Sequence, residues 1–426
     1  MENRVVRLGN GVDGLYIKND RFNSTLISFH FFVPLNSKTI SANALLPFLL
    51  SSCTDKYKDY TDVNIRLLEL YGAMLSASVQ KKGDSLHIRL KINLINDELT
   101  FENEGILSKG ADLLFSLVFE PSLSGKSFCE KDVAREKCKT IDRIEGEINN
   151  KRSFARTRLI EKMFGTDPYG LFVYGKTDEV ESITGEKLYD AWQQLLSTAY
   201  IRLHIVGKHL PDGIFENLKA RFENIKRENV VNITNAVLLP ESENVNTVTE
   251  YYAVTQGKLT MGYTCSDNGE GDKALPHLIF SDIFGGGTYS KLFKNVREKQ
   301  SLCYYCSASG VFKKGYMLVD SGIDAQNADR VIEAVGKELN DIKNGNIDDC
   351  EIESSKKAVC ETLMSYYDSA SSLDLWYAKS IDIDLWSPKE MAEKIKSITK
   401  EQIVNAANCY KLHTIYKLLP EGSNLK

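Results

Sequence analysis

The six histidines are the first residues to test for metal binding or acid–base chemistry. A zinc-binding helix of the H-E-x-x-H or H-x-x-E-H type places two imidazoles one helical turn apart, and no pair in this sequence has that pattern. Three of the six alternate with apolar residues in stretches typical of strands. We therefore expect those three to be solvated or hydrogen-bonded strand residues rather than metal ligands. The six are His30, His87, His204, His209, His277 and His413, and the three in strand-like stretches are His30, His87 and His204.

A second candidate is the C-x-x-C sequence from Cys303 to Cys306. A zinc ribbon needs a second such pair or histidines at matching spacing, and a thioredoxin-type redox pair opens a helix after a strand. Neither context is present here. Two small, half-buried residues in an extended segment are the better interpretation.

The glycine-rich stretch GGGTYSKLF (285–293) has the composition of a phosphate-binding loop. It lacks the G-K-[ST] ending and the spacing of a dinucleotide motif, so we expect a loop between two helices, with Thr288 or Ser290 near the N-cap of the second. Arg297 and Tyr304 follow, seven residues apart. From composition alone, the arginine would be a surface salt-bridge partner and the tyrosine a packing residue.

The elements that position these residues belong to a mixed fold. Three stretches alternate with the period of two that is typical of antiparallel strands, each with one packed face and one wetter face: Thr25 to Val33, Leu86 to Leu94 and Ile201 to Ile205. Helical stripes lie between them, through Val63, Leu67, Leu70 and Tyr71 and through Ala134, Cys138, Ile141, Ile144 and Ile148. The fold class predicted is α+β.

An internal repeat indicates two related halves, and the alternative is a chance similarity between two short stretches. YGAMLSASVQKKGDSLHIRLKI (71–92) is similar to YYCSASGVFKKGYMLVDSGI (304–323), and a helical stripe precedes both copies. A polar, asparagine-rich stretch separates the halves and reads as a linker. The predicted division is an N-terminal domain at 1–226, a linker at 227–246 and a C-terminal domain at 247–426.

Composition excludes several classes of function. The 426 residues include 53 basic and 58 acidic ones, spread through the chain, whereas nucleic acids and anionic membranes select clustered Lys and Arg. The longest apolar run, Ala44 to Leu50, is far too short to span a bilayer. No signal-peptide pattern is present, and nine scattered cysteines fit reduced thiols. We expect a cytoplasmic protein that binds neither nucleic acid nor membrane.

The stretch GGGTYSKLFKNVREKQSLCYY (285–305) closely resembles a signature of the pitrilysin superfamily of zinc peptidases, which includes insulinase and the mitochondrial processing peptidase. LLELYGAMLSAS (67–78) also resembles the family, and the resemblance extends over essentially the whole chain. It implies two related domains, each an antiparallel sheet covered by helices. The most similar branch is bacterial and zinc-less, is commonly encoded beside a zinc-bearing sister, and has been associated with modification of elongation factor P.

The resemblance also locates a degenerate metal site. In active members, H-x-x-E-H lies on the helix before the second of these segments. When Thr54 is aligned with the threonine that ends the family motif, Ala44, Pro47 and Phe48 occupy the positions of the two ligands and the general base. None of the three can bind Zn²⁺ or accept a proton from a metal-bound water.

The family's distal glutamate belongs in the helix around residues 133–148. Glu136 matches one of two acidic positions seven apart, and the other position falls on Arg143, whose guanidinium would repel Zn²⁺. We therefore expect neither catalytic residues nor a metal cofactor in this chain.

The same resemblance implies a substrate-binding role for Arg297 and Tyr304. In the family, residues at these positions hydrogen-bond the substrate backbone near the scissile bond. The predicted function is the non-catalytic subunit of a heterodimeric zinc metallopeptidase, with a zinc-bearing sister chain as partner and a peptide as substrate. The alternative is a purely structural or peptide-binding pseudopeptidase, and a lone active peptidase is disfavoured. Self-association of the isolated chain into a homodimer is left open.

Overall fold

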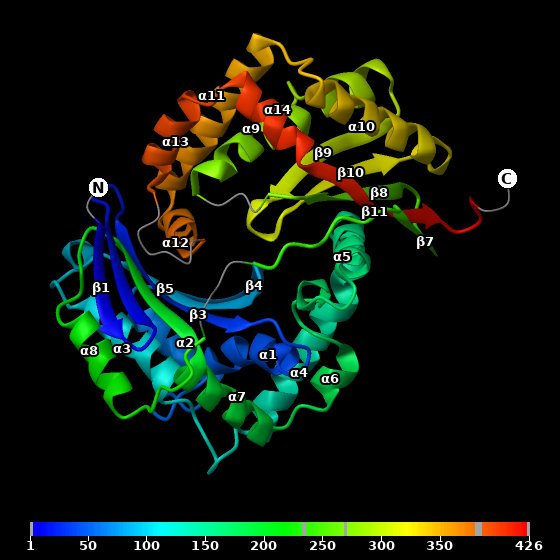
Figure 1. Cartoon of the computed structure of the whole chain (residues 1–426). Helices are drawn as coiled ribbons and strands as arrows, with labels where there is room; N and C mark the ends of the chain where they lie inside the picture. Colours follow the sequence, from blue (N-terminus) through cyan, green and yellow to red (C-terminus); the bar gives the residue numbers. More distant parts are fainter. Residues whose placement is uncertain (1–2, 232–235, 268–270, 380–385, 424–426) are drawn as a thin grey trace. The chain divides into compact units, whose positions relative to one another are not determined.

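The computed structural model describes residues 3–231, 236–267, 271–379 and 386–423 (Figure 1). The chain divides into two compact units. Unit 1 contains residues 1–145, 171–234 and 366–385, and unit 2 contains residues 146–170, 235–365 and 386–426. Each unit therefore includes one segment from the other half of the chain. The predicted division into contiguous domains at 1–226 and 247–426 contains no such crossing segments. That division remains a prediction about the duplicated halves, and residues 232–235 of its linker lie outside the described residues.

Unit 1 is built on a six-stranded sheet in the order β1-β2-β6-β3-β5-β4. The β2–β6 pair is parallel and the other neighbours are antiparallel. All three stretches predicted as strands lie in this sheet, in β3, β5 and β6. The strands are β1 (Asn3–Gly9), β2 (Val12–Lys18), β3 (Ser24–Pro34), β4 (Met74–Lys82), β5 (Ser85–Ile95) and β6 (Tyr200–Gly207).

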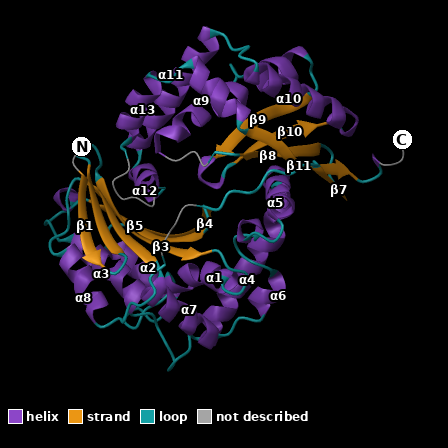
Figure 2. Ribbon diagram, viewed as in Figure 1, coloured by secondary structure: helices purple, strands orange, loops and turns teal. Residues whose placement is uncertain are grey.

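Helices cover the apolar face of this sheet (Figure 2). Phe29 of β3, for example, packs against Phe115 of α3, with the ring centres 5.4 Å apart. The helices of unit 1 are α1 (Ile40–Leu50), α2 (Tyr60–Glu69), α3 (Ile106–Phe119), α4 (Glu130–Glu145), α6 (Thr177–Glu181), α7 (Gly185–Thr198), α8 (Ile214–Glu223) and α12 (Ala370–Ala378).

Unit 2 contains a five-stranded sheet in the order β7-β11-β8-β10-β9, in which only the β7–β11 pair is parallel among the described strands. Its strands are β7 (Asn246–Tyr252), β8 (Gly257–Cys265), β9 (Cys303–Val311), β10 (Tyr316–Ile323) and β11 (Tyr410–Pro420). Its helices are α5 (Lys151–Phe164), α9 (Ala274–Gly285), a π-helix (Leu292–Lys299), α10 (Ala328–Lys343), α11 (Asp349–Ser365), α13 (Pro388–Lys396) and α14 (Lys400–Asn408).

The two sheets share one topology. The order β2-β6-β3-β5-β4 in unit 1 corresponds strand for strand to β7-β11-β8-β10-β9 in unit 2, including the parallel pair at the same place. The repeated sequences 71–92 and 304–323 lie in corresponding hairpins, β4–β5 and β9–β10. The predicted α+β fold with two related sheets is confirmed, and each sheet has one parallel pair in addition to the antiparallel ones.

The expectation of a wetter face on the unit 1 strands was wrong. His30, His87 and His204 are fully buried, as is Ser28. The reason is α12, which packs on β3 and β6 and covers the polar face. This helix lies about 170 residues beyond β6 in the sequence, so the alternation of the strands could not reveal it.

The helical stripe predicted near residues 133–148 was also placed on the wrong face. Ala134 and Cys138 are exposed in α4, whereas Val133, Glu136 and Thr140 are buried. The buried face thus contains a carboxylate and a hydroxyl, which a count of apolar residues assigns to solvent.

Candidate functional site

Helix α1 contains the three positions predicted to be a degenerate metal site. It runs without interruption from Ile40 to Leu50, through Pro47, although proline cannot donate the i→i−4 hydrogen bond of a helix. Ala44 is fully buried, Pro47 is buried, and Phe48 is half-buried. The helix therefore serves as a packing element with no side chain that could hold a metal ion at these positions.

Helix α4 packs on α1 and places Arg143 over Phe48. The guanidinium carbon lies 3.9 Å from the centre of the phenylalanine ring, and 6.0 Å from the ring of Tyr174. A cation this close to an aromatic face is attracted by the ring's quadrupole. Of the positions that the resemblance predicts for the metal site, one is thus occupied by an aromatic ring and another by a cation stacked on that ring.

Glu136 is the one acidic residue among the predicted metal-site positions. Its side chain is buried in α4, and its Oε1 accepts hydrogen bonds from Arg135 Nε at 3.1 Å and Lys139 Nζ at 2.9 Å. Two cations already neutralise this carboxylate. The residues at these positions do not fit a zinc ion, and no metal-dependent step can be assigned to them.

The second predicted site lies in unit 2. Arg297 is in the last turn of the π-helix, with its guanidinium 4.5 Å from the ring of Phe293 and its Nη1 3.5 Å from Glu298. Tyr304, the second residue of β9, donates a hydrogen bond from its hydroxyl to Asp324 Oδ1 at 3.1 Å. That hydrogen bond raises the pKa of Tyr304, which keeps the hydroxyl protonated at neutral pH. Both side chains are accessible: Tyr304 is 55% exposed, and the Arg297 side chain 38%.

The loop before the π-helix has the predicted structure. Helix α9 ends at Gly285, and Ser290 lies directly before Lys291, the N-cap of the π-helix; Ser290 Oγ accepts a hydrogen bond from the backbone N–H of Phe293 at 3.4 Å. The C-x-x-C sequence that follows is extended, as expected, because β9 begins at Cys303.

A bulge in the β9–β10 pairing brings Cys303 and Cys306 to interact. Cys306 lies opposite Ser321, whereas Cys303 lies opposite Ile323 after a shift of register. The hydrogen bond with Cys306 lowers the pKa of the Cys303 thiol to about 7, assisted by a hydrogen bond with Ser321 and by the charge of Arg297. Spacing alone did not reveal this coupling, because a regular strand would place residues i and i+3 on opposite faces.

A buried polar cluster lies between the unit 1 sheet and α12. His30 Nε2 and His204 Nδ1 lie 2.9 and 3.0 Å from Asp374 Oδ1, and Arg89 pairs with the other carboxylate oxygen. All four side chains are almost completely buried. Although burial raises the pKa of Asp374, the interactions with these neighbours hold it well below its usual range.

The hydrogen bonds of this cluster run in one direction. Gln80 Nε2 lies 2.8 Å from His87 Nδ1, and His87 Nε2 lies 2.8 Å from His30 Nδ1. An amide donor at one end and a carboxylate at the other assign each imidazole a single N–H, pointing toward Asp374. Burial lowers the pKa of His30 to about 3 and that of His87 well below its usual value, so both rings are neutral.

Three ligand-type atoms, on His30, His204 and Asp374, lie within 4.8 Å of one another. The geometry argues against a metal ion, because Asp374 Oδ1 also accepts from Ser28 Oγ at 2.7 Å and the Arg89 guanidinium would repel a cation. The cluster anchors α12 to the sheet. Sequence reasoning missed Asp374, although it is the one charge in the apolar helix ASSLDLWYA and could have been suspected for that reason.

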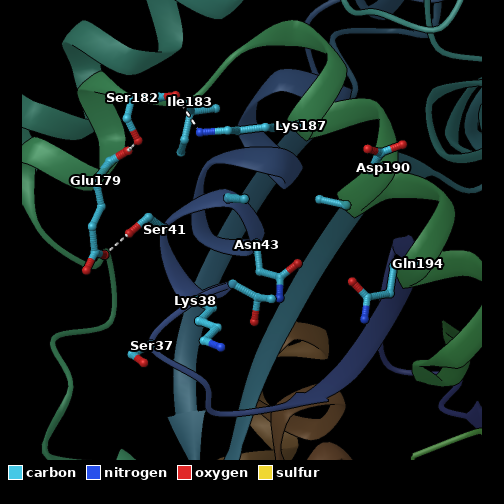
Figure 3. A pocket seen from close by; sticks show the side chains of 13 residues that line it. Ser37, Lys38, Ser41, Asn43, Glu179, Ser182, Ile183, Lys187, Asp190 and Gln194 are labelled. Atoms are coloured by element: carbon cyan, nitrogen blue, oxygen red, sulfur yellow. Dashed lines mark hydrogen bonds between the residues drawn. The ribbon is translucent and has the colours of Figure 1, made fainter.

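A pocket of about 510 Å³ lies beside the N-terminal end of α1, between that end and helices α6 and α7 (Figure 3). Ser41 Oγ donates to Glu179 Oε2 at 2.6 Å on its wall, and Asn43, Lys187 and Gln194 line the rest. None of the predicted site residues lines this pocket.

Comparison with known proteins assigns the family. The probable inactive metalloprotease YmfF of Bacillus subtilis is 30% identical over 410 residues, which is 96% of each chain. The chain belongs to the M16 peptidase family. A profile of this family described as the peptidase M16 inactive domain matches residues 182–359.

Solved structures agree with this M16 assignment. A conserved protein from Enterococcus faecalis superposes with a TM-score of 0.88 at 26% identity, over 99% of both chains. A structure of the peptidase M16 inactive domain from Pseudomonas fluorescens gives a TM-score of 0.80 over 99% of this chain and 98% of its own, at 15% identity that supports the fold alone.

This M16 chain is therefore a homologue of the inactive type, as the residues of α1 and α4 predict. In the part of the chain that the structure describes, no helix combines the length and the apolarity needed to cross a bilayer.

Proposed function

We propose that this M16 homologue is the non-catalytic subunit of a heterodimeric zinc peptidase. The partner would hold Zn²⁺ on an H-x-x-E-H helix, and this chain would supply Arg297 and Tyr304 to the backbone of the bound peptide. The observation that supports the proposal is a contrast between the two predicted sites. The metal positions on α1 have no ligand side chain, whereas the two hydrogen-bond donors are present and accessible.

The chemistry of the two side chains suits this role. A guanidinium has five N–H donors in a fixed plane, and a protonated tyrosine hydroxyl can donate to a carbonyl oxygen or to an oxyanion that develops on it. Asp324 holds the Tyr304 hydroxyl in place before substrate binds. When the peptide binds, its carbonyl oxygen must either replace Asp324 as the acceptor of the Tyr304 hydroxyl proton or accept that proton together with Asp324.

A cytoplasmic location is part of the same proposal. All nine cysteines are free thiols, three of them exposed, which suits a reducing compartment.

The test is reconstitution of the purified chain with a sister chain that contains H-x-x-E-H, followed by peptide hydrolysis. Arg297→Ala and Tyr304→Phe should each lower kcat/KM by roughly 10- to 100-fold, because each removes a donor aimed at the reacting carbonyl. Tyr251→Phe, at an exposed position of β7 on the opposite edge of the unit 2 sheet from β9, is the matched control and should leave turnover unchanged.

Association of the two chains, measured by size-exclusion chromatography, separates loss of assembly from loss of chemistry. If both site variants assemble and cleave peptide as fast as the wild-type mixture, the composite site is refuted.

One observation favours a second candidate, a structural or peptide-binding pseudopeptidase. Arg297 and Tyr304 already have partners within unit 2, on Phe293, Glu298 and Asp324, and would support the fold through them. Under this alternative the two variants lower the stability of the chain and leave the partner's turnover unchanged.

A further inference from the structure

Unit 2 contains a convergence of two thiols and an imidazole that the peptidase resemblance does not explain. Cys265 is the last residue of β8, His277 is in the first turn of α9, and Cys409 follows the end of α14. One ligand-type atom from each lies within 4.8 Å of the other two, and Cys265 Sγ is 3.9 Å from His277 Nδ1. None of the three belongs to the predicted degenerate metal site or to the predicted Arg297–Tyr304 site.

Ordered backbone holds the two cysteines in place. Tyr410, next to Cys409, is the register partner of Cys265 across the β8–β11 pair. The backbone N–H of Ser266 donates to the carbonyl of Cys409 at 3.1 Å, and that of Cys265 donates to the carbonyl of Gly315 at 2.7 Å. Both thiols thus project from the same end of the sheet.

His277 is held by packing. Helix α9 contacts α14, and the imidazole meets the ring of Tyr410 edge to face at 5.6 Å. The cluster is therefore carried by three rigid elements rather than by a loop, which is the arrangement that keeps ligands at a fixed separation.

The ligand types and distances suit Zn²⁺. A tetrahedral zinc with Zn–S near 2.3 Å and Zn–N near 2.0–2.1 Å places a sulfur and a nitrogen about 3.5 Å apart. The observed Cys265–His277 separation of 3.9 Å needs a contraction of about 0.4 Å, which side-chain torsions can supply. Two thiolates and one imidazole also form a softer ligand set than magnesium or calcium prefers.

The far side of the imidazole has the environment of a metal-binding histidine. When Nδ1 binds a metal, the proton lies on Nε2, and His277 Nε2 faces Asp267 Oδ2 at 3.9 Å. Once within hydrogen-bonding distance of Nε2, about 0.5 Å closer, a carboxylate on this side would orient the ring and raise its basicity. Lys343 Nζ donates to the carbonyl of Tyr410, the residue after Cys409, at 2.6 Å.

A metal ion can reach the three ligand atoms from the side of Cys409. Cys265 and His277 are buried, whereas Cys409 is half-buried. We propose that Cys265, His277 Nδ1 and Cys409 bind one Zn²⁺, with water at the fourth position and with Asp267 as a positioning residue. Binding replaces the two thiol protons, which are released to solvent, and joins the end of β8 to α9 and α14.

The test uses the full-length chain, reduced, stripped with a chelator and titrated with ZnCl₂ against a chromophoric competitor. We expect one equivalent to bind, and Co²⁺ in its place to give the sulfur-to-cobalt charge-transfer absorption of thiolate ligation. Asp267→Asn, which changes a supporting residue, should weaken zinc binding by about 10- to 100-fold. Cys409→Ser removes a ligand and should therefore weaken zinc binding by more than about 100-fold. The melting temperature should rise with zinc in the wild type and not in Cys409→Ser.

Two matched controls separate this site from other thiols. Cys350→Ser, exposed on α11, and Cys303→Ser, in the β9 pair, should bind zinc as the wild type does. The proposal is overturned if no equivalent binds, if Cys409→Ser retains the affinity, if Cys303→Ser loses it, or if the reduced chain shows no thiolate-to-cobalt band. The outcome is independent of the reconstituted peptidase assay, because that assay depends on zinc held by the partner chain.

Discussion

The guanidinium of Arg143, on α4, stacks on the ring of Phe48, on α1, with 3.9 Å between the guanidinium carbon and the ring centre. The resemblance to active members of the family predicts a metal-ligand position at Phe48. Here the same two helices are joined by a cation–π contact between side chains. A contact that needs no ion thus joins the two helices at the positions predicted for the metal site.

The strength of this contact can be measured by a double-mutant cycle with Phe48→Leu and Arg143→Met. Because both side chains are partly exposed, we expect a coupling of about 0.5–1 kcal/mol in the free energy of unfolding by urea. The matched control pairs Arg143→Met with a change at Phe101, which is 93% exposed, and should give a coupling near zero. Equal couplings in the two cycles would show that the stacking contributes nothing.

Rebuilding the zinc motif tests whether Arg143 opposes metal binding. The variant with Ala44→His, Pro47→Glu and Phe48→His restores H-x-x-E-H, yet a guanidinium remains beside the new ligands. We expect Arg143→Glu to tighten zinc binding of that variant by at least roughly 10-fold, since it removes a repulsive charge and adds a carboxylate. Both proteins should be compared in the Cys409→Ser background, so that thiol-bound zinc does not contribute. Equal affinity with and without the Arg143 change would contradict the electrostatic explanation.

The buried histidines make unit 1 sensitive to acid. The pKa of His30 is about 3 in the folded chain and 6.5 when unperturbed, so the unfolded state binds one more proton between these values. Neutral His30 therefore does not reduce the free energy of unfolding above pH 6.5. As the pH falls from 6.5 toward 3, the free energy of unfolding decreases by at most about 1.4 kcal/mol per pH unit because of this residue. His30→Gln should therefore flatten the dependence of the unfolding free energy on pH by about 2 kcal/mol between pH 6 and 4.5.

A neighbouring variant provides the control for that slope. Ser371→Ala, on α12, removes the acceptor of hydrogen bonds from Lys91 at 2.9 Å and from Arg89 at 3.3 Å, but no titrating group. It should lower stability by a similar amount at every pH. A parallel shift for His30→Gln as well would show that this histidine is not the source of the acid sensitivity.

The Cys303 thiol should react with iodoacetamide at neutral pH. Because its pKa is about 7, half of it is thiolate there, and the thiolate is the nucleophile. The rate of alkylation at Cys303, followed by peptide mass spectrometry, should reach half its maximum near pH 7. Cys306→Ala removes the hydrogen bond that stabilises the thiolate, so the midpoint should move to higher pH. An unmoved midpoint would assign the lowered pKa to the Ser321 hydroxyl and the Arg297 charge instead of Cys306.

Local patterns predicted much of this structure correctly. The alternation in residues 25–33, 86–94 and 201–205 located β3, β5 and β6, and the repeat of 71–92 in 304–323 located corresponding hairpins of two sheets with one topology. These signals succeed because strand periodicity and hairpin sequences depend on residues close together in the chain.

Contacts between distant segments could not be predicted in the same way. The burial of His30 and His204 depends on Asp374, some 170 residues or more away, and the coupling of Cys303 with Cys306 depends on a bulge opposite β10. The Cys265–His277–Cys409 cluster is assembled from three elements, of which α14 follows α9 by more than 110 residues. No spacing rule covers such a set.

Helix α12 belongs to unit 1 although it follows most of unit 2 in the sequence, and this order has a consequence for synthesis of the chain. When β6 leaves the ribosome, the unit 1 sheet still lacks α12, so His30, Arg89 and His204 face solvent or a chaperone. At 5–20 residues per second, the roughly 170 residues up to Ala378 take about 10–30 s. A fragment ending near residue 226 would remain in this unfinished condition, and truncation at the midpoint would yield a sheet with its charged surface uncovered rather than an independent half.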